Sequence, residues 1–134
     1  MVTEAQKEAL IKAACAAREQ SYAPYSKYRV GAAILAGDGQ IITGVNVENA
    51  SFGLSICAER TAVVKGISEG IRDFMAIAIC TENLGSPCGA CRQTLAEFAG
   101  DIPVWLADTE GNVLETSLHE LLPGHFSPGH LPSE

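Results

Sequence analysis

Three cysteines and one glutamate have the spacing of a metal site with a proton carrier beside it. Cys88 and Cys91 are three residues apart in a predicted helix, so their thiols point the same way and can share one ion. Cys57 begins another predicted helix, and Glu59 follows two positions later. Thiolates at helix N-termini are soft, readily ionised ligands that suit zinc. The pattern therefore predicts a zinc site built from two separate segments of the chain.

Three thiolates leave the fourth position of a tetrahedral zinc ion to water, which is the plan of a catalytic site. Glu59 is poorly placed to be a fourth ligand, because positions i and i+2 do not share one side of a helix. Side chains in a first turn tilt toward the helix N-terminus, so Glu59 can reach the water and transfer protons. The alternative is that Glu59 only balances the helix dipole.

Two further side chains have a role if the metal is present. Zinc with three thiolates carries a net negative charge, which weakens its pull on the bound water. The guanidinium of Arg60 would withdraw that charge by donating to the sulfurs. Gln93, just past Cys91, is placed to donate in the same way. Without the metal, Arg60 is simply a solvated surface charge.

Other interpretations of the cysteines stay open at this point. A C-x-x-C pair is also a redox motif, but such a pair usually follows the first strand of a thioredoxin-like unit, and this one comes late. A structural zinc site needs four protein ligands, and His119, His125 or His130 would then be the fourth. Cys15 and Cys80 lie in an Ala-rich helix and at a strand end, as small buried hydrophobic residues do.

The elements that must position these residues alternate between helix and strand. Thr3 and Gln6 form a capping box, and a helix is predicted over 3–20. The later elements are a hairpin of 29–36 and 40–47, a helix at 57–69, a strand at 74–80, a helix at 88–100 closed by Gly100, a strand at 103–108, and a short strand with a helical turn at 113–122.

This order predicts an α/β fold in which helices cover the faces of a mixed sheet. If the helices at 57–69 and 88–100 lie on the same face, their N-termini emerge side by side at one edge of the sheet. Ligand sites in open α/β sheets gather at the carboxyl ends of the strands. That edge is therefore where we expect the three thiols to meet.

Length and composition limit the function classes. A chain of 134 residues is expected to form a single domain over 1–134, and 47% hydrophobic residues exclude disorder. The net charge of −7 argues against a long nucleic acid as partner. The N-terminus lacks the apolar core of a secretory signal, and no apolar run reaches the ~18 residues of a membrane span. We expect a cytoplasmic protein with no membrane partner, whose cysteines are thiols or metal ligands.

Several motifs together resemble the zinc-dependent nucleobase deaminases, and in particular the small, homotetrameric cytidine deaminases. The motifs occur in the order and spacing of that family, and the resemblance spans about residues 20–127. They are "YAPYSKYRVGAA", "TGVNVENASFG", "CAERTA", "SPCGACRQ" and "LLPGHF".

The resemblance implies hydrolytic deamination of cytidine and 2′-deoxycytidine to the uridines, a reaction of pyrimidine salvage. It implies a three-layer α/β/α fold with a central mixed five-stranded sheet, and a homotetramer with sites completed across subunits. It assigns one zinc ion per chain to Cys57, Cys88 and Cys91, and proton transfer to Glu59. The implied substrate contacts are Asn46 and Glu48 with the ribose 3′-hydroxyl, the backbone of Ala58 with the base, Tyr28 stacked near the base, and Phe126 closing a neighbour's site.

Two positions depart from the family pattern. Tyr28 stands where the family usually has Phe, which adds a hydroxyl that must find a partner or reach solvent. Phe52 stands where many members have Tyr, so a hydrogen bond across a subunit contact is absent at this position. Neither change touches the zinc chemistry, but both bear on which nucleoside is preferred.

Competing functions differ in the substrate or in the absence of catalysis. A modified nucleoside or a nucleoside antibiotic is the main alternative substrate. A nucleotide phosphate calls for a basic cluster, and the sequence offers only Lys27, Arg29 and Arg60 nearby. Relatives that edit polynucleotides usually have His as first ligand, where this chain has Cys57. The alternative from another class is a zinc-stabilised binding module without catalysis.

Overall fold

The computed structural model describes residues 1–132 and contains the predicted sequence of helices and strands. Within these residues, no helix combines the length and the apolar character needed to cross a bilayer. The elements are α1 (Glu4–Ala17), β1 (Gly31–Ala36), β2 (Ile41–Val45), α2 (Ala58–Ser68), β3 (Phe74–Cys80), α3 (Gly89–Phe98), β4 (Pro103–Ala107), β5 (Val113–Ser117) and α4 (Leu118–Leu121), with short 3₁₀ turns at Arg18–Gln20, Phe52–Leu54 and Pro128–His130.

The strands form one five-stranded mixed sheet in the order β2-β1-β3-β4-β5. β3 and β4 are parallel, while the other neighbouring pairs are antiparallel. Because parallel neighbours need a crossover, α3 lies between β3 and β4 in the chain and returns across one face of the sheet. The carboxyl end of β3 and the N-terminus of α3 therefore lie at the same edge.

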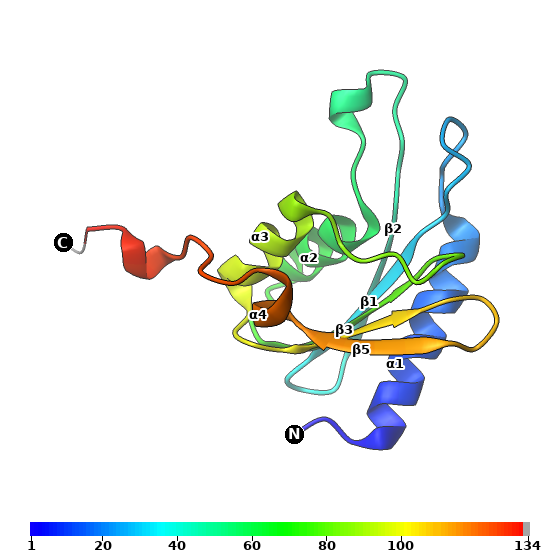
Figure 1. Ribbon diagram of the computed structural model, residues 1–134. Coiled ribbons are helices and arrows are strands. Elements are labelled where there is room, and N and C mark those ends of the chain that lie inside the picture. Colours follow the sequence, from blue (N-terminus) through cyan, green and yellow to red (C-terminus); the bar gives the residue numbers. More distant parts are fainter. Residues whose placement is uncertain (133–134) are drawn as a thin grey trace.

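The helices cover both faces of this sheet, which confirms the three-layer α/β/α prediction (Figure 1). On one face, Leu10 and Ala14 of α1 pack against Ala33 and Leu35 of β1. The residues that alternate with these along β1, such as Ile34, lie on the other face of the sheet and belong to the core under α2 and α3. Both faces of β1 and β3 are buried, which explains why these strands read as continuous apolar runs.

The ends of α1 and α3 show where sequence signals predict helix boundaries correctly and where they do not. The capping box at Thr3 is present, with reciprocal hydrogen bonds between Thr3 and Gln6. The predicted helix of 3–20 ends as an α-helix at Ala17 and continues as a 3₁₀ turn. The prediction that Gly100 closes α3 is wrong. Ala99 is already extended, with φ −136° and ψ 149°, so the helix ends before the glycine.

Gly44 lets α2 lie directly on β2. A Cβ atom at this position would stand 2.5 Å from the carbonyl oxygen of Ala58 and closer still to the amide nitrogen of Ala62. Both contacts are backbone atoms, which cannot move aside as a flexible side chain can. Because Ala58 directly follows Cys57, Gly44 also sets how closely the start of α2 approaches the sheet.

We expect Gly44→Ala to destabilise the fold and displace the start of α2. Overpacking of a close contact typically costs about 1–3 kcal/mol, which would lower the melting temperature by several degrees. Thermal denaturation followed by circular dichroism measures this change. Gly53→Ala is the control, because a Cβ there has no heavy atom within 4 Å. Equal melting temperatures for the two variants would contradict the close-contact argument.

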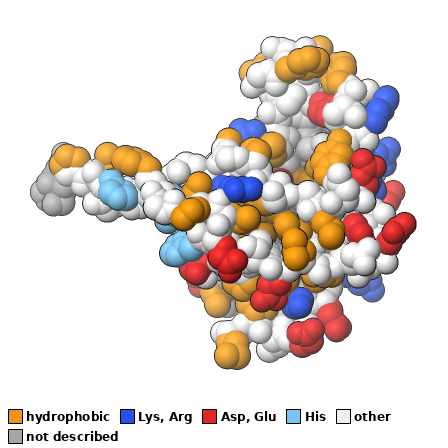
Figure 2. Space-filling view, viewed as in Figure 1, with side chains coloured by type: hydrophobic (Ala, Val, Ile, Leu, Met, Phe, Trp, Pro, Cys, Tyr) orange, Lys and Arg blue, Asp and Glu red, His pale blue; other side chains and the backbone are white. Residues whose placement is uncertain are grey.

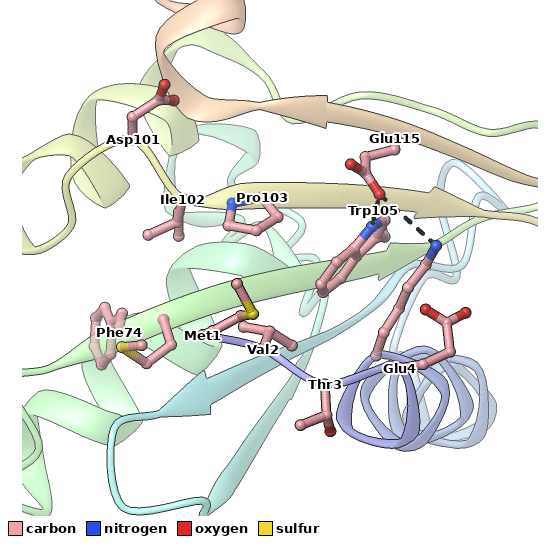
Figure 3. A pocket seen from close by; sticks show the side chains of 12 residues that line it. Met1, Val2, Thr3, Glu4, Phe74, Asp101, Ile102, Pro103, Trp105 and Glu115 are labelled. Atoms are coloured by element: carbon pink, nitrogen blue, oxygen red, sulfur yellow. Dashed lines mark hydrogen bonds and ion pairs between the residues drawn. The ribbon is translucent and has the colours of Figure 1, made fainter.

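One hollow lies far from the predicted thiols, on the face that α1 covers (Figure 3). It has a volume of about 520 Å³ and lies between the N-terminal residues and the starts of β3 and β4. Trp105 Nε1 donates to Glu115 at 2.6 Å, and the Lys7 ammonium lies 3.7 Å from the same carboxylate. Lys7, Trp105 and Glu115 are thus already paired with one another.

Candidate active site

Three sulfur atoms meet at the N-termini of α2 and α3. Cys57 is the N-cap of α2, Cys88 is the N-cap of α3, and Cys91 lies in the first turn of α3. The Cys57 and Cys88 Sγ atoms are 3.7 Å apart, and those of Cys88 and Cys91 are 3.3 Å apart. All three sulfurs lie within 4.8 Å of one another. The predicted convergence of two helix N-termini is therefore confirmed.

The sulfur positions fit a zinc ion. A tetrahedral ion with Zn–S bonds of about 2.3 Å holds its sulfurs about 3.8 Å apart, close to the spacing found. Among the residues that the structure describes, the cluster contains these three ligands and no histidine. Three protein ligands leave a position for water or substrate, so the set has the composition of a catalytic zinc site rather than a structural one.

Cys57 and Cys91 do not ionise alike. The pKa of Cys57 is lowered to about 5, first because Cys91 donates a hydrogen bond to its sulfur and also because Arg60 does, while burial opposes the shift. The same hydrogen bond raises the pKa of Cys91, and burial adds to that effect. Cys57 therefore ionises more readily than Cys91, and a bound cation would favour the thiolate form of Cys91.

Arg60 makes the contact predicted from its position. Its Nη2 atom lies 3.7 Å from Cys57 Sγ, and this hydrogen bond raises the pKa of the guanidinium. The Nε atom of Arg60 is buried and has no hydrogen-bond partner within the described part of the chain. Such an orphaned donor is costly unless a ligand or a negatively charged cluster compensates it. The arrangement suits a guanidinium that stabilises thiolates bound to a cation.

We expect Arg60→Gln to weaken zinc binding or activity by about 10- to 100-fold, as loss of a group that supports a metal ligand typically does. Competition with a chromophoric chelator measures the zinc affinity. The matched control is Arg72→Gln, since the Arg72 guanidinium donates to the carbonyls of Ile67 and Ile71 at the opposite end of α2. If both variants kept the wild-type affinity, Arg60 would be an ordinary surface charge.

The other two cysteines lie outside the cluster. Cys15 and Cys80 belong to the core between α1 and the sheet, where the Cys15 thiol donates to Cys80 Sγ. Burial raises the pKa of Cys80 to about 12, so it stays a neutral thiol. The prediction that these two residues are apolar packing is confirmed.

Glu59 lies beside the sulfurs at the base of a hollow. Its side chain is 4% exposed, and burial raises the pKa of its carboxyl group to about 7. The hydrogen bond from its own amide opposes this shift. A carboxyl group with a pKa near neutrality exchanges protons readily in both directions, which general acid–base catalysis requires.

The hollow above Glu59 has a volume of about 270 Å³. It lies at the carboxyl end of β3, where ligand sites in α/β sheets are expected. Its wall brings together residues from four segments that are distant in the sequence. They are Ser26, Tyr28 and Val30; Asn46 and Glu48; Cys57, Ala58 and Glu59; and Ile79, Thr81, Gly85, Ser86 and Cys88.

Asn46 and Glu48 line the hollow, and both already form hydrogen bonds with other residues of the protein. The Asn46 amide donates to the carbonyl of Tyr28 at 2.7 Å and accepts from the amide of Val30 at 2.9 Å. Glu48 accepts from the amides of Tyr25 and Ser26, and its pKa is lowered, first by the Ser26 hydroxyl. Glu48 is therefore a carboxylate held in a fixed orientation.

Gln93 and Phe126 contact each other and are not part of the thiol cluster. The Gln93 side-chain amide donates to the backbone carbonyl of Phe126 at 2.8 Å. This hydrogen bond replaces the predicted one to the sulfurs, because Gln93 is two positions beyond Cys91 and so points to another side of α3. Phe126 is 57% exposed, stacks on His130 and does not line the hollow of its own chain.

Sequence reasoning missed six residues of the wall, namely Ser26, Val30, Ile79, Thr81, Gly85 and Ser86. Thr81, Gly85 and Ser86 belong to the loop between β3 and α3, which sequence inspection treats only as a connection. Their position directly after a buried strand was a usable signal, because strand ends at this edge carry ligand sites. Ser26 has no comparable signal, since it is held at the hollow by its contacts with Glu48 and with the amide of Tyr28.

Comparison with known proteins agrees with this site. Residues 4–106 match the family model described as the cytidine and deoxycytidylate deaminase zinc-binding region. The chain is 51% identical over 123 residues to a cytidine deaminase of Sporosarcina psychrophila, covering 90% of each chain. It is also 51% identical over 124 residues to a cytidine deaminase of Halalkalibacterium halodurans, covering 90% of this chain and 94% of that one.

A solved structure shows the same fold. The crystal structure of cytidine deaminase from Burkholderia pseudomallei superposes with a TM-score of 0.85 at 49% identity, covering 89% of this chain and 98% of the other. The fold, the three thiols and the extent of these matches all lead to the same conclusion. The chain belongs to the cytidine and deoxycytidylate deaminase family of zinc-dependent hydrolases.

Proposed function

We propose that the protein deaminates cytidine and 2′-deoxycytidine to uridine and 2′-deoxyuridine, with release of ammonia. The observation that carries the proposal is the position of a buried carboxyl group, Glu59, beside three zinc-binding thiols at the base of a hollow. Relatives about half identical over nine-tenths of the chain are named cytidine deaminases, which supports this choice of substrate.

The residues of the wall favour a nucleoside over a nucleotide. No Lys or Arg is among the described residues that line the hollow, while Glu48 and Glu59 are. A phosphate group would therefore meet carboxylates and find no cation to pair with, which is unfavourable. A neutral nucleoside meets hydroxyls, amides and one aromatic ring instead.

Glu59 is proposed to move each proton of the reaction. Zinc, when held by Cys57, Cys88 and Cys91, supplies a Lewis acid that lowers the pKa of water to near neutrality. Glu59 would accept a proton from the attacking water and deliver it to ring nitrogen N3 as the water oxygen adds to C4. It then passes the second water proton to the amino group, which leaves as ammonia when the C4–N bond breaks. Glu59 ends in its starting state.

Asn46 and Glu48 are proposed to bind the ribose 3′-hydroxyl. A carboxylate offers about four lone-pair sites and an amide nitrogen two donors, so each group has capacity left beyond its contacts with the protein. The ring of Tyr28 lines the same hollow and is proposed to stack near the base, with the backbone of Ala58 contacting the base from the start of α2.

We further propose that the protein is a homotetramer. Phe52 is 74% exposed and Leu54 is 66% exposed. Both residues lie in the loop between β2 and α2. Figure 2 shows hydrophobic side chains over this loop and along the C-terminal segment, which extends away from the body of the protein in Figure 1. Exposed apolar groups of this kind mark contact surfaces. Phe126, on that segment, would then close the hollow of a neighbouring subunit.

Multi-angle light scattering measures the mass directly. A tetramer has four times the 14.1 kDa of one chain. A monomeric mass would contradict the assembly. We also propose that the protein works as one domain in the cytoplasm in pyrimidine salvage, since its cysteines are free thiols of a kind that persists in reducing compartments.

A substrate panel followed by ultraviolet absorbance tests the proposed reaction. We expect a zinc-replete preparation to convert cytidine and 2′-deoxycytidine and to leave cytidine monophosphate unchanged. Metal content is measured on the same sample. Failure to convert either nucleoside, with one zinc ion bound per chain, would contradict the proposed substrates and direct attention to modified nucleosides or nucleoside antibiotics.

A further inference from the structure

We propose that the hydroxyl group of Tyr28 is a positioning group, which holds the loop at residues 81–87 against the substrate hollow by donating a hydrogen bond to Asn83. The inference rests on the proposed function, because it assigns this loop the task of enclosing a nucleoside. Tyr28 O–H lies 2.6 Å from Asn83 Oδ1. A phenylalanine ring at this position would offer no such donor.

Two other side chains support the loop: Thr81 holds its first half, and Arg92 of α3 donates to the Ser86 hydroxyl at 3.1 Å and to the Pro87 carbonyl at 2.7 Å. Thr81, at the end of β3, is 2% exposed, and its hydroxyl accepts hydrogen bonds from the amides of Asn83 at 3.3 Å and Gly85 at 2.8 Å. These bonds curl residues 81–85 into a tight turn. The bond from Tyr28 is the one that ties this turn to the opposite wall of the hollow.

The turn holds a conformation that needs outside support. Leu84 has a φ of 61°, which costs a residue with a side chain about 1–3 kcal/mol and persists only where the surroundings enforce it. Gly85 is required beside it, because a Cβ atom at that position would collide with the Tyr28 hydroxyl oxygen. Tyr28 and the turn are therefore in direct contact.

Tyr28 is itself anchored on the far side of the hollow. Its amide donates to the Ser26 hydroxyl at 3.0 Å, and its carbonyl accepts from the Asn46 amide at 2.7 Å. Ser26 and Asn46 both line the hollow. The Tyr28 side chain thus forms a bridge from the proposed sugar-binding residues to the loop that leads into Cys88.

This bridge acts on substrate binding more than on the chemical step. Thr81, Gly85 and Ser86 form one wall of the hollow, whereas Glu59 and the thiols lie at its base on α2 and α3. The Tyr28 hydroxyl proton is already committed to Asn83, so it is not a donor to the substrate. Loss of the bridge should therefore raise KM and change kcat little.

A double-mutant cycle tests the bridge. We expect Tyr28→Phe and Asn83→Ala each to raise the KM for cytidine about three- to tenfold, which is the usual net value of one hydrogen bond, with kcat within about twofold of wild type. The double variant should resemble Asn83→Ala, because that change removes the bond from Tyr28 together with the longer contact of the Thr81 hydroxyl with Asn83 Oδ1 at 3.4 Å. Asn83→Asp keeps the acceptor and should stay near the wild-type KM. Additive effects, or an equal loss in kcat, would overturn the proposal.

Amide hydrogen exchange without any nucleoside provides a second, independent readout. The amides of Asn83 and Gly85 should exchange faster in Tyr28→Phe and in Asn83→Ala, with zinc content unchanged. Tyr22→Phe is the control, because Tyr22 is an exposed tyrosine outside the hollow. Unchanged exchange in both test variants overturns the bridge even where cytidine is turned over. A wild-type protein that fails to deaminate cytidine contradicts the proposed function, while the exchange result still decides on the bridge.

Discussion

Glu59→Gln is expected to keep the fold and the zinc ion and to lose cytidine deamination by a factor of about 10² to 10⁴, which is what a positioned general acid–base typically contributes. Glutamine has nearly the same shape, so it fills the buried position of Glu59 without a cavity. It cannot accept the proton from water, and the reaction would then lack a route from water to N3. Initial rates from ultraviolet absorbance, with zinc measured on the same sample, check this result.

The matched control is Glu69→Gln. Glu69 follows the last residue of α2, so it lies on the same helix as Glu59 but at the end away from the thiols. We expect this variant to keep wild-type rates. A Glu59→Gln protein that retained activity within about tenfold of wild type would remove Glu59 from the mechanism, and its role would reduce to balancing the helix dipole.

Cys88→Ser is expected to reduce both zinc content and activity, the latter by more than about 100-fold, because loss of a ligand costs more than loss of a group that only supports one. Cys88 is exposed, so the substitution leaves the packing of the core intact. The hydroxyl of serine does not ionise near neutral pH and is a poor substitute for a thiolate. Metal analysis after dialysis and the deamination rate measure the two effects.

Cys15→Ser is the control for Cys88→Ser, because it removes a thiol that is not one of the three predicted zinc ligands. Cys15 is a partly buried thiol on α1, remote from the cluster. Its replacement should leave one zinc ion per chain and the wild-type rate. Full zinc content in Cys88→Ser would show that another group completes the site, and the three-sulfur arrangement would then be wrong.

The sequence was sufficient for features that depend on local spacing and on topology. Cys88 and Cys91 share one turn of helix, so their pairing follows from helix geometry alone. The approach of Cys57 follows from the packing of α2 and α3 on the same face of the sheet, which the order of elements allowed. The three-layer fold and the meeting of the sulfurs are confirmed, while proton transfer by Glu59 stays a prediction.

Features that depend on contacts between distant side chains could not be predicted. The partner of the Tyr28 hydroxyl lies 55 positions away, in a loop with no periodic pattern. Gln93 was expected near the sulfurs, yet its amide bonds the carbonyl of Phe126, because rotation about α3 separates it from Cys91. Such hydrogen bonds depend on the final positions of whole elements, which are determined by packing and not by residue spacing.

The metal ligands come from two helix starts that are far apart in the chain, and this has a consequence for biosynthesis. Cys57 precedes Cys88 by 31 positions. At roughly 5–20 residues per second, a ribosome releases the first thiol about 2 to 6 seconds before its partners. During that interval Cys57 is a lone nucleophile on an incomplete chain, open to oxidation. The complete set of three sulfurs therefore exists only once the last of the three cysteines has been translated.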